Sequence, residues 1–134
     1  MLLALLIFGL IGTAVELALL GHDEGALQFV PFVLIGLGLA VIVWHVIAHN
    51  SSSLRVMRFM MGAFIAAGVA GIALHYQGSV EFQKEVDPSM HGFALFIKAM
   101  RSKAPPVLAP AIMTQFGLLG FVWTYLEKDR REKT

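Results

Sequence analysis

Apolar residues are concentrated in four runs along the chain, and polar or proline-bearing breaks separate these runs. They cover residues 2–20, 28–48, 57–75 and 107–126, to within a residue or two. Each run is close to the ~20 residues that an α-helix needs to cross a hydrocarbon core of ~30 Å. Inside lipid every backbone amide must find its hydrogen-bond partner within the protein, which excludes open strands. The pattern therefore predicts an all-α integral membrane protein with four transmembrane helices.

The breaks between the runs predict how the helices are connected. The first two breaks are short, at residues 21–25 and 49–53, and short connections join antiparallel neighbours. We therefore expect a single domain over residues 1–134, folded as an up-down-up-down four-helix bundle. The charged tail at 127–134 is expected to extend the last helix into water. Two of its acid–base pairs have the i,i+4 spacing that stabilises a helix: Glu127 with Arg131, and Asp129 with Lys133.

The third break, residues 76–106, is long enough to hold a helix of its own outside the bilayer. Asp87 followed by Pro88 is a favourable helix start, with the acid as N-cap, and Pro105-Pro106 would end such a helix. Four apolar side chains between these points share one helical face: Phe93, Phe96, Ile97 and Met100. We expect an amphipathic extramembrane helix whose apolar face either docks on the bundle or lies at the membrane surface.

Charges near the predicted helix ends indicate which side of the membrane each end faces. Lys and Arg tend to stay on the cytoplasmic side. They occur at the second break and in the tail, at Arg55, Arg58, Lys128, Arg130, Arg131 and Lys133. The first break instead contains Asp23 and Glu24 and neither Lys nor Arg. We therefore expect both termini to be cytoplasmic; the third break carries cations too, but longer loops cross a membrane with less regard to charge.

Composition agrees with lipid as the main solvent. Hydrophobic residues make up 57% of the 134-residue chain and charged residues 14%, against roughly 25% charged in an ordinary soluble domain. A net charge of +1 argues against a nucleic-acid partner. The absence of cysteine excludes disulfides, thiolate metal ligands and a thiol nucleophile. The expected partners are the lipid bilayer and other membrane subunits or further copies of the chain.

Glu16 is the acid that lies well inside a predicted span. Ionisable residues at membrane depth are candidates for function because an unpaired charge there is costly. Gly9 and Gly12 precede Glu16 at i−7 and i−4 and share its helical face, so another helix could approach this face closely. Glu16 is therefore a candidate for a ligand or proton role, for a structural hydrogen bond, or for contact with a partner across an interface.

In size and plan the chain resembles the small multidrug resistance transporters, which are also four-helix chains with a glutamate in the first helix. The resemblance rests on Glu16 and on the four runs, and it implies proton-coupled transport through that carboxyl group. The aromatic and glycine motifs of that family have no counterpart here, and the long third break departs from its compact form.

Histidines suggest a cofactor site at two places. His45 and His49 are at i,i+4 near the end of the second run, and three methionines follow the next break: Met57, Met60 and Met61. Two imidazoles beside thioethers could bind haem iron or a soft metal ion. His75, near the end of the third run, is a further candidate ligand. The alternative is that methionine fills the core and that histidine is favoured by the dipole at a helix C-terminus.

Small residues recur at spacings that place them on single helical faces, where they let helix backbones approach closely. These candidate packing residues are Gly9, Gly12, Gly68, Gly71, Gly117 and Gly120. Gln115 is a polar residue within the fourth run, beside a strip that also holds Thr114 and Thr124. The strips could serve packing within the bundle, or they could face another subunit, a flat pigment or a lipid.

The sequence lacks a phosphate-binding glycine loop, H-E-x-x-H, G-x-S-x-G and an aspartate-rich cation site, so we expect no enzyme. The favoured hypothesis is a small polytopic membrane protein that acts by association, as an accessory or structural subunit of a larger complex or as a homo-oligomer. Two alternatives remain. One is a subunit for electron transfer that binds haem, a pigment or a metal, and the other is a small proton-coupled transporter using Glu16. We expect no cofactor under the favoured hypothesis.

Overall fold

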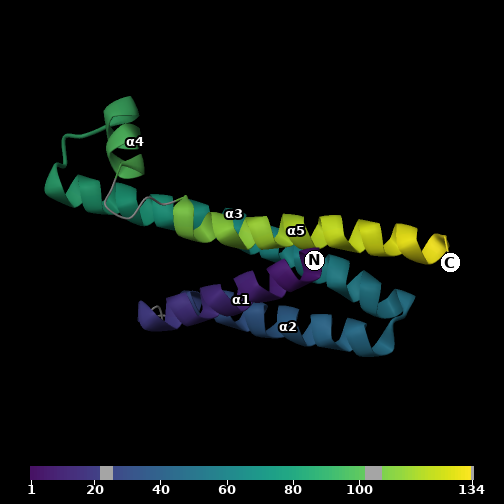
Figure 1. Ribbon diagram of the computed structural model, residues 1–134. Coiled ribbons are helices and arrows are strands. Elements are labelled where there is room, and N and C mark those ends of the chain that lie inside the picture. The colour runs from purple at the N-terminus through teal and green to yellow at the C-terminus, as the bar shows by residue number, and fades with distance from the viewer. Residues whose placement is uncertain (22–25, 102–106, 134) are drawn as a thin grey trace.

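The computed structural model describes residues 1–21, 26–101 and 107–133, and every regular element in these ranges is helical. The elements are α1 (Leu2–Leu19), the 3₁₀ turn η1 (Ala26–Phe29), α2 (Val30–Ala48), α3 (Ser51–Val86), α4 (Gly92–Met100) and α5 (Leu108–Glu132). Figure 1 shows α1, α2, α3 and α5 as long rods, with the short α4 at one end. The predicted all-α class is confirmed.

Within the described residues, three segments are long and apolar enough to cross a membrane: Leu2–Leu19, Leu27–Ala48 and Ser51–Val86. The helices predicted at 2–20 and 28–48 are thus confirmed almost to the residue. The fourth predicted run lies in α5, which is helical throughout, and its crossing of a membrane remains a prediction. The first predicted break at 21–25 falls mostly outside the described residues.

α3 is longer at both ends than the span predicted at 57–75. Its 36 residues extend over about 54 Å, at 1.5 Å per residue, well beyond the ~30 Å of a hydrocarbon core. At its start Asn50 is the N-cap, and its side chain accepts a hydrogen bond from the Ser53 amide at 2.8 Å. Beyond residue 75 good helix formers such as Gln77, Glu81 and Lys84 continue the helix outside the apolar region. The prediction of a loop beginning at residue 76 was therefore wrong.

The connection between α2 and α3 is shorter than predicted. His49 ends α2 in the left-handed conformation, with φ of 45°, and Asn50 begins α3. Serines 51–53, which were assigned to the break, form the first turn of α3 because the Asn50 cap satisfies one of its free amides. The tight connection folds α2 back along α3 as a hairpin (Figure 1).

A short helix lies between α3 and α5 as predicted, but it begins later than expected. Asp87 does not cap it, because its carboxylate accepts hydrogen bonds from the Ser89 hydroxyl at 2.6 Å and the Ser89 amide at 3.0 Å. These bonds close a local turn, and they lower the pKa of Asp87. α4 therefore starts at Gly92, after His91. Pro105-Pro106, the predicted stop, lies outside the described residues.

The face by which α4 docks also differs from the prediction. Leu95 and Ala99 are its buried residues, and α4 packs on α3. The predicted apolar face is largely on the other side, where Phe93 and Phe96 remain exposed. The small Ala99 lets α4 approach α3 closely, and Phe96 meets the ring of Tyr76 on α3 while staying partly exposed.

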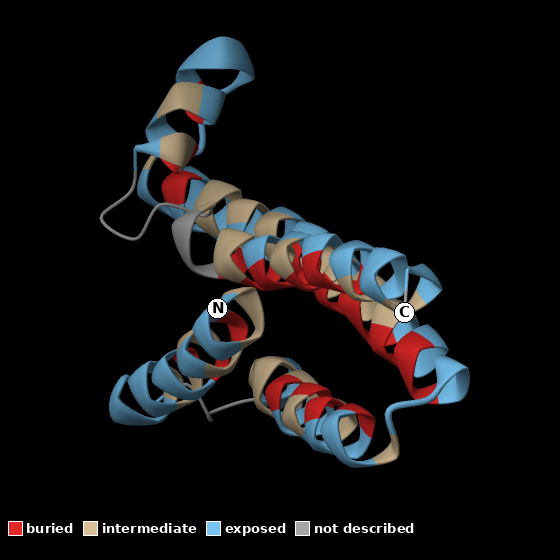
Figure 2. Cartoon of the chain, turned by 45° about the vertical axis from the view of Figure 1, so that its right-hand side comes forward, coloured by how far each residue is buried: buried red, intermediate tan, exposed pale blue. Residues whose placement is uncertain are grey.

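The tightest contact in the protein is between α3 and α5. Glycines allow it: a Cβ atom on Gly117 would lie 2.6 Å from the Met61 carbonyl oxygen, and one on Gly68 would lie 2.7 Å from the Thr114 amide nitrogen. α1 packs against α2 and α5, and α2 packs against α3. Figure 2 shows the buried residues of these four helices on their inward faces. The core includes Leu6, Leu10, Ile35, Ile42, Met57, Met61, Phe64, Met113 and Phe116.

Candidate functional site

A buried polar network lies where α2 ends, α3 begins and α5 approaches its C-terminus. Its centre is His45, which is 1% exposed. The Ser53 hydroxyl donates to the Asn50 carbonyl at 2.9 Å, so its own oxygen is free to accept. His45 Nδ1 lies 2.8 Å from that oxygen and must therefore carry the hydrogen that it donates to Ser53. The other ring nitrogen, Nε2, then holds a lone pair.

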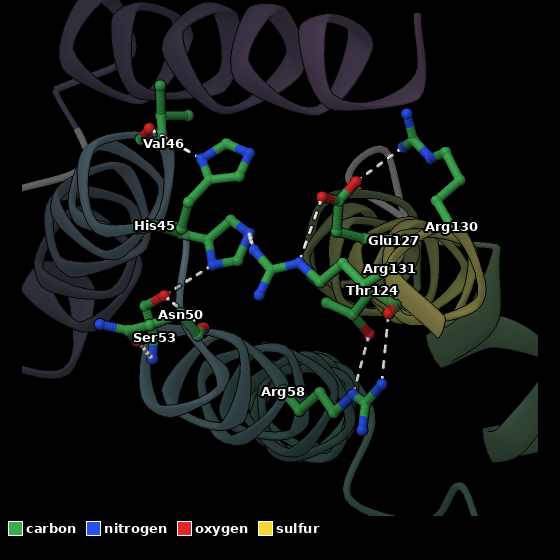
Figure 3. Close-up of polar contacts among 10 residues, drawn as sticks. His45, Val46, Asn50, Ser53, Arg58, Thr124, Glu127, Arg130 and Arg131 are labelled. Carbon is green, nitrogen blue, oxygen red and sulfur yellow. Dashed lines mark hydrogen bonds and ion pairs between the residues drawn. The ribbon is translucent and has the colours of Figure 1, made fainter. Parts of the chain in front are cut away.

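The tail of α5 supplies the group that faces this lone pair. Arg131 Nη2 lies 3.4 Å from His45 Nε2 and donates to it (Figure 3). Glu127 lies on the other side of Arg131, with 3.6 Å between its Oε1 and Arg131 Nε, and its Oε2 is 2.8 Å from Arg130 Nη2. The chain Glu127–Arg131–His45–Ser53–Asn50 thus links α5 to the α2–α3 hairpin. Its donors and acceptors match only while His45 is neutral.

A second arginine joins α3 to α5 next to this network. Arg58 donates to the Thr124 carbonyl at 3.2 Å and to the Thr124 hydroxyl at 3.4 Å. Its guanidinium also lies 5.0 Å from the centre of the Tyr125 ring, which is a cation–π distance. Thr124 is fully buried and donates its own hydroxyl hydrogen to the Phe121 carbonyl at 2.9 Å. Arg58 therefore fixes the register of α3 on α5 at the predicted cytoplasmic end.

The predicted ligand pair His45 and His49 does not present two free nitrogens to one metal ion. Both nitrogens of His45 are engaged, and the exposed His49 contacts the Val46 carbonyl through Nδ1 at 3.0 Å. The two rings stack, with centroids 5.6 Å apart and planes inclined by 25°. The Trp123 ring also packs against His45 in an edge-on arrangement, and the centroids of the two rings are 5.4 Å apart. An iron or copper ion at His45 would have to displace Arg131.

The other candidate residues lie apart from this network. His75 is exposed on α3, roughly 33 Å along the helix from Ser53 at 1.5 Å per residue. Gln115 is exposed on α5. Within the described ranges no group of three or more His, Cys, Asp or Glu side chains is placed to hold a metal ion.

On α1, Gly9 is packed against α5, whereas Gly12 and Glu16 face outward. A Cβ on Gly9 would lie 2.5 Å from the Phe116 ring, so Gly9 packs on α5. Gly12 has no atom within 4 Å of that position, and Glu16, one turn later, is exposed. The Glu16 side chain forms no hydrogen bond or ion pair with the described part of the chain. Gly12 and Glu16 therefore make an outward face on α1, which is also lined by the exposed Phe8 and Leu19.

The other predicted packing glycines all meet α5 or α3. A Cβ on Gly71 would lie 2.9 Å from the Pro110 Cβ, whereas one on Gly120 would clash with the Met61 sulfur. The Thr114 hydroxyl is buried against Gly68 without a hydrogen-bond partner among the described residues. These close contacts show that the α3 and α5 strips are occupied within the chain, in contrast to the face at Gly12.

Sequence reasoning named His45 but not the residues that surround it. Ser53 and Arg131 were read as parts of a break and a tail, and Arg58 as an orientation signal. The spacing Asn50-x-x-Ser53 is a local capping signal that could have been found. Arg131 could not, because it is remote from His45 in sequence. Comparisons of the chain with protein-family models, with curated proteins and with solved structures find no match.

Proposed function

We propose that the protein is a four-span membrane protein, arranged up-down-up-down, that works by association through the outward face of α1. The observation that carries the proposal is the contrast between the glycines. Gly68, Gly71, Gly117 and Gly120 lie directly against atoms of the neighbouring helix. Gly12 has open space beside it instead, one turn from the unpartnered carboxyl group of the exposed Glu16. Another helix, from a larger complex or from a second copy, would fill that space.

The energetics of Glu16 support a partner on this face. An acid in a membrane-spanning helix costs up to roughly 3 kcal/mol at the midplane and less near the interface. Glu16 lies one turn before the end of α1, so its cost is at the lower end. A hydrogen bond across a helix–helix contact offsets such a cost by about 1 kcal/mol. Because Glu16 points away from the bundle core, this position favours association over a transport path between the helices.

Enlarging Gly12 tests this face. Gly12→Leu is expected to dissociate the assembly, since a bulky side chain prevents close approach of the partner helix. Ala18→Leu is the matched control, because Ala18 is also exposed on α1 but lies about 120° around the helix. The measurement is oligomeric state and co-purifying subunits after mild detergent extraction. The proposal would lose its basis if Gly12→Leu and Ala18→Leu had the same oligomeric state and partners. It would also lose its basis if the unsubstituted protein were extracted as a monomer without partners.

The carboxyl group is tested separately from the open space at Gly12. Glu16→Gln should keep the assembly, because the amide preserves hydrogen bonding at the same size. Glu16→Leu should weaken it by about tenfold, or roughly 1.4 kcal/mol. If Glu16→Gln abolishes proton-driven uptake in vesicles while the assembly stays intact, the transporter alternative replaces ours.

We also propose that both termini are cytoplasmic. The cations of the α2–α3 connection and of the α5 tail support this orientation. With no native cysteine in the chain, single cysteines report topology cleanly. Ser52→Cys and Lys133→Cys should react with an impermeant thiol reagent from the cytoplasmic side, and Lys98→Cys from the opposite side. Reaction of positions 52 and 98 from the same side would contradict the four-span arrangement.

A further inference from the structure

α4 has two apolar surfaces: one is buried against α3, and the other remains largely exposed in the described part of the chain. Leu95 and Ala99 face α3 and are buried. On the outer side Phe93 is 76% exposed and Phe96 43% exposed. Their rings stack with centroids 6.1 Å apart, and Phe96 lies 5.9 Å from the ring of Tyr76 on α3. Tyr76, Phe96 and Phe93 thus form a continuous aromatic row that runs outward from α3.

The aromatic row begins where the apolar run of α3 ends. Tyr76 directly follows the apolar run that ends at residue 75, and aromatic rings concentrate at this level of a membrane protein. Figure 1 shows α4 at the end of the molecule where α1 also ends, directed across α3 and not along it. If α3 crosses the membrane, a helix in this orientation runs parallel to the membrane surface.

The charges of α4 suit a lipid headgroup layer. Residues 88–101 contain no Asp or Glu, and both Lys98 and Arg101 are exposed. Neither cation forms a salt bridge within the described residues. The nearest acid in sequence is Asp87, whose carboxylate accepts hydrogen bonds from Ser89; the Lys98 charge acts on it as a smaller influence, without a salt bridge. On a helical projection both cations lie about 80–140° from Phe93. From this position their long side chains can reach lipid phosphates while the Phe93 ring enters the boundary between headgroups and acyl chains.

We propose that α4 is an interfacial helix that binds anionic phospholipids in the membrane leaflet opposite the chain termini. Phe93 and Phe96 enter the boundary between headgroups and acyl chains, and Lys98 and Arg101 contact lipid phosphates. The occupant of the aromatic face is thus lipid and not a second copy of the chain. The inference rests on the proposed crossing of the membrane by α3, and it is independent of association through α1.

Nitroxide labels on single cysteines test the depth of this face. Phe93→Cys is compared with Ala94→Cys, which is exposed on the cationic side of the same turn. The protein is reconstituted in phosphatidylcholine vesicles with and without phosphatidylglycerol, and the accessibility of each label to oxygen and to a water-soluble nickel complex is measured. We expect the label at 93 to be accessible to oxygen and shielded from nickel, and the label at 94 to show the reverse.

Two other labelling results would overturn the proposal. Access of nickel to both labels would place α4 in water. Shielding of the label at 93 from oxygen and nickel alike would mean that protein covers the face. Reversing both charges, Lys98→Glu with Arg101→Glu, should reduce the depth of the label at 93 in vesicles that contain phosphatidylglycerol but not in phosphatidylcholine alone. An unchanged depth in both would contradict the anionic-lipid contact. The outcome does not depend on Gly12 or Glu16, so it is separable from the association test.

Discussion

Gly117→Ala is expected to loosen the whole bundle although it adds a single methyl group. The added carbon would lie 2.6 Å from the Met61 carbonyl oxygen and 3.1 Å from the Ile65 amide nitrogen. Both are backbone atoms of α3, so no side-chain rotation relieves the clash and the helices must separate. Overpacking of this kind costs about 2–3 kcal/mol. Thermal unfolding in detergent, followed by circular dichroism, would measure the loss.

Two other glycines make this prediction specific. Gly36→Ala on α2 should be neutral or stabilising by up to about 1 kcal/mol, because nothing lies within 4 Å of the new carbon and alanine favours helix. Gly120→Ala should cost less than Gly117→Ala, since its obstacle is the flexible Met61 side chain. Equal effects at positions 36 and 117 would mean that the α3–α5 contact is not the closest one in the protein.

His45→Leu is expected to destabilise the protein by about 2–3 kcal/mol. The substitution removes the bonds to Ser53 and Arg131, which are worth roughly 1 kcal/mol each, and it leaves a guanidinium hydrogen without its acceptor. His49→Leu, one turn later, should change stability by no more than about 0.5 kcal/mol because that side chain is exposed. Both variants would be measured by unfolding in detergent.

The same pair separates the structural role of His45 from a cofactor role. If His45 and His49 were ligands of one haem or metal ion, both substitutions would remove the visible absorption of protein purified from its native membrane. If His45 acts through the hydrogen-bond network, His45→Leu should lower stability much more than His49→Leu, and neither should change the absorption. Equal losses at the two positions would favour the electron-transfer alternative instead.

The sequence by itself determined the features that depend on neighbours along the chain. The lengths of the first two apolar runs placed α1 and α2, because a helix satisfies its own backbone and needs only a sufficient apolar stretch. The spacing of the tail predicted the ion pairs Glu127–Arg131 and Asp129–Lys133, now seen at 3.6 and 2.6 Å. The presence of an extramembrane helix in the third break was predicted for the same local reason.

Only the tertiary structure decided which faces meet. The end of α3 at Val86 could not be read from hydropathy, because the helix continues through polar residues beyond the apolar run. α4 docks through Leu95 and Ala99 because close approach favours a small residue over a larger apolar face. Gly9 packs on α5 while Gly12 remains open, although both belong to one predicted strip. His45 meets Arg131 across 86 positions of sequence, and only the packing of α2, α3 and α5 brings a lone pair and a guanidinium together.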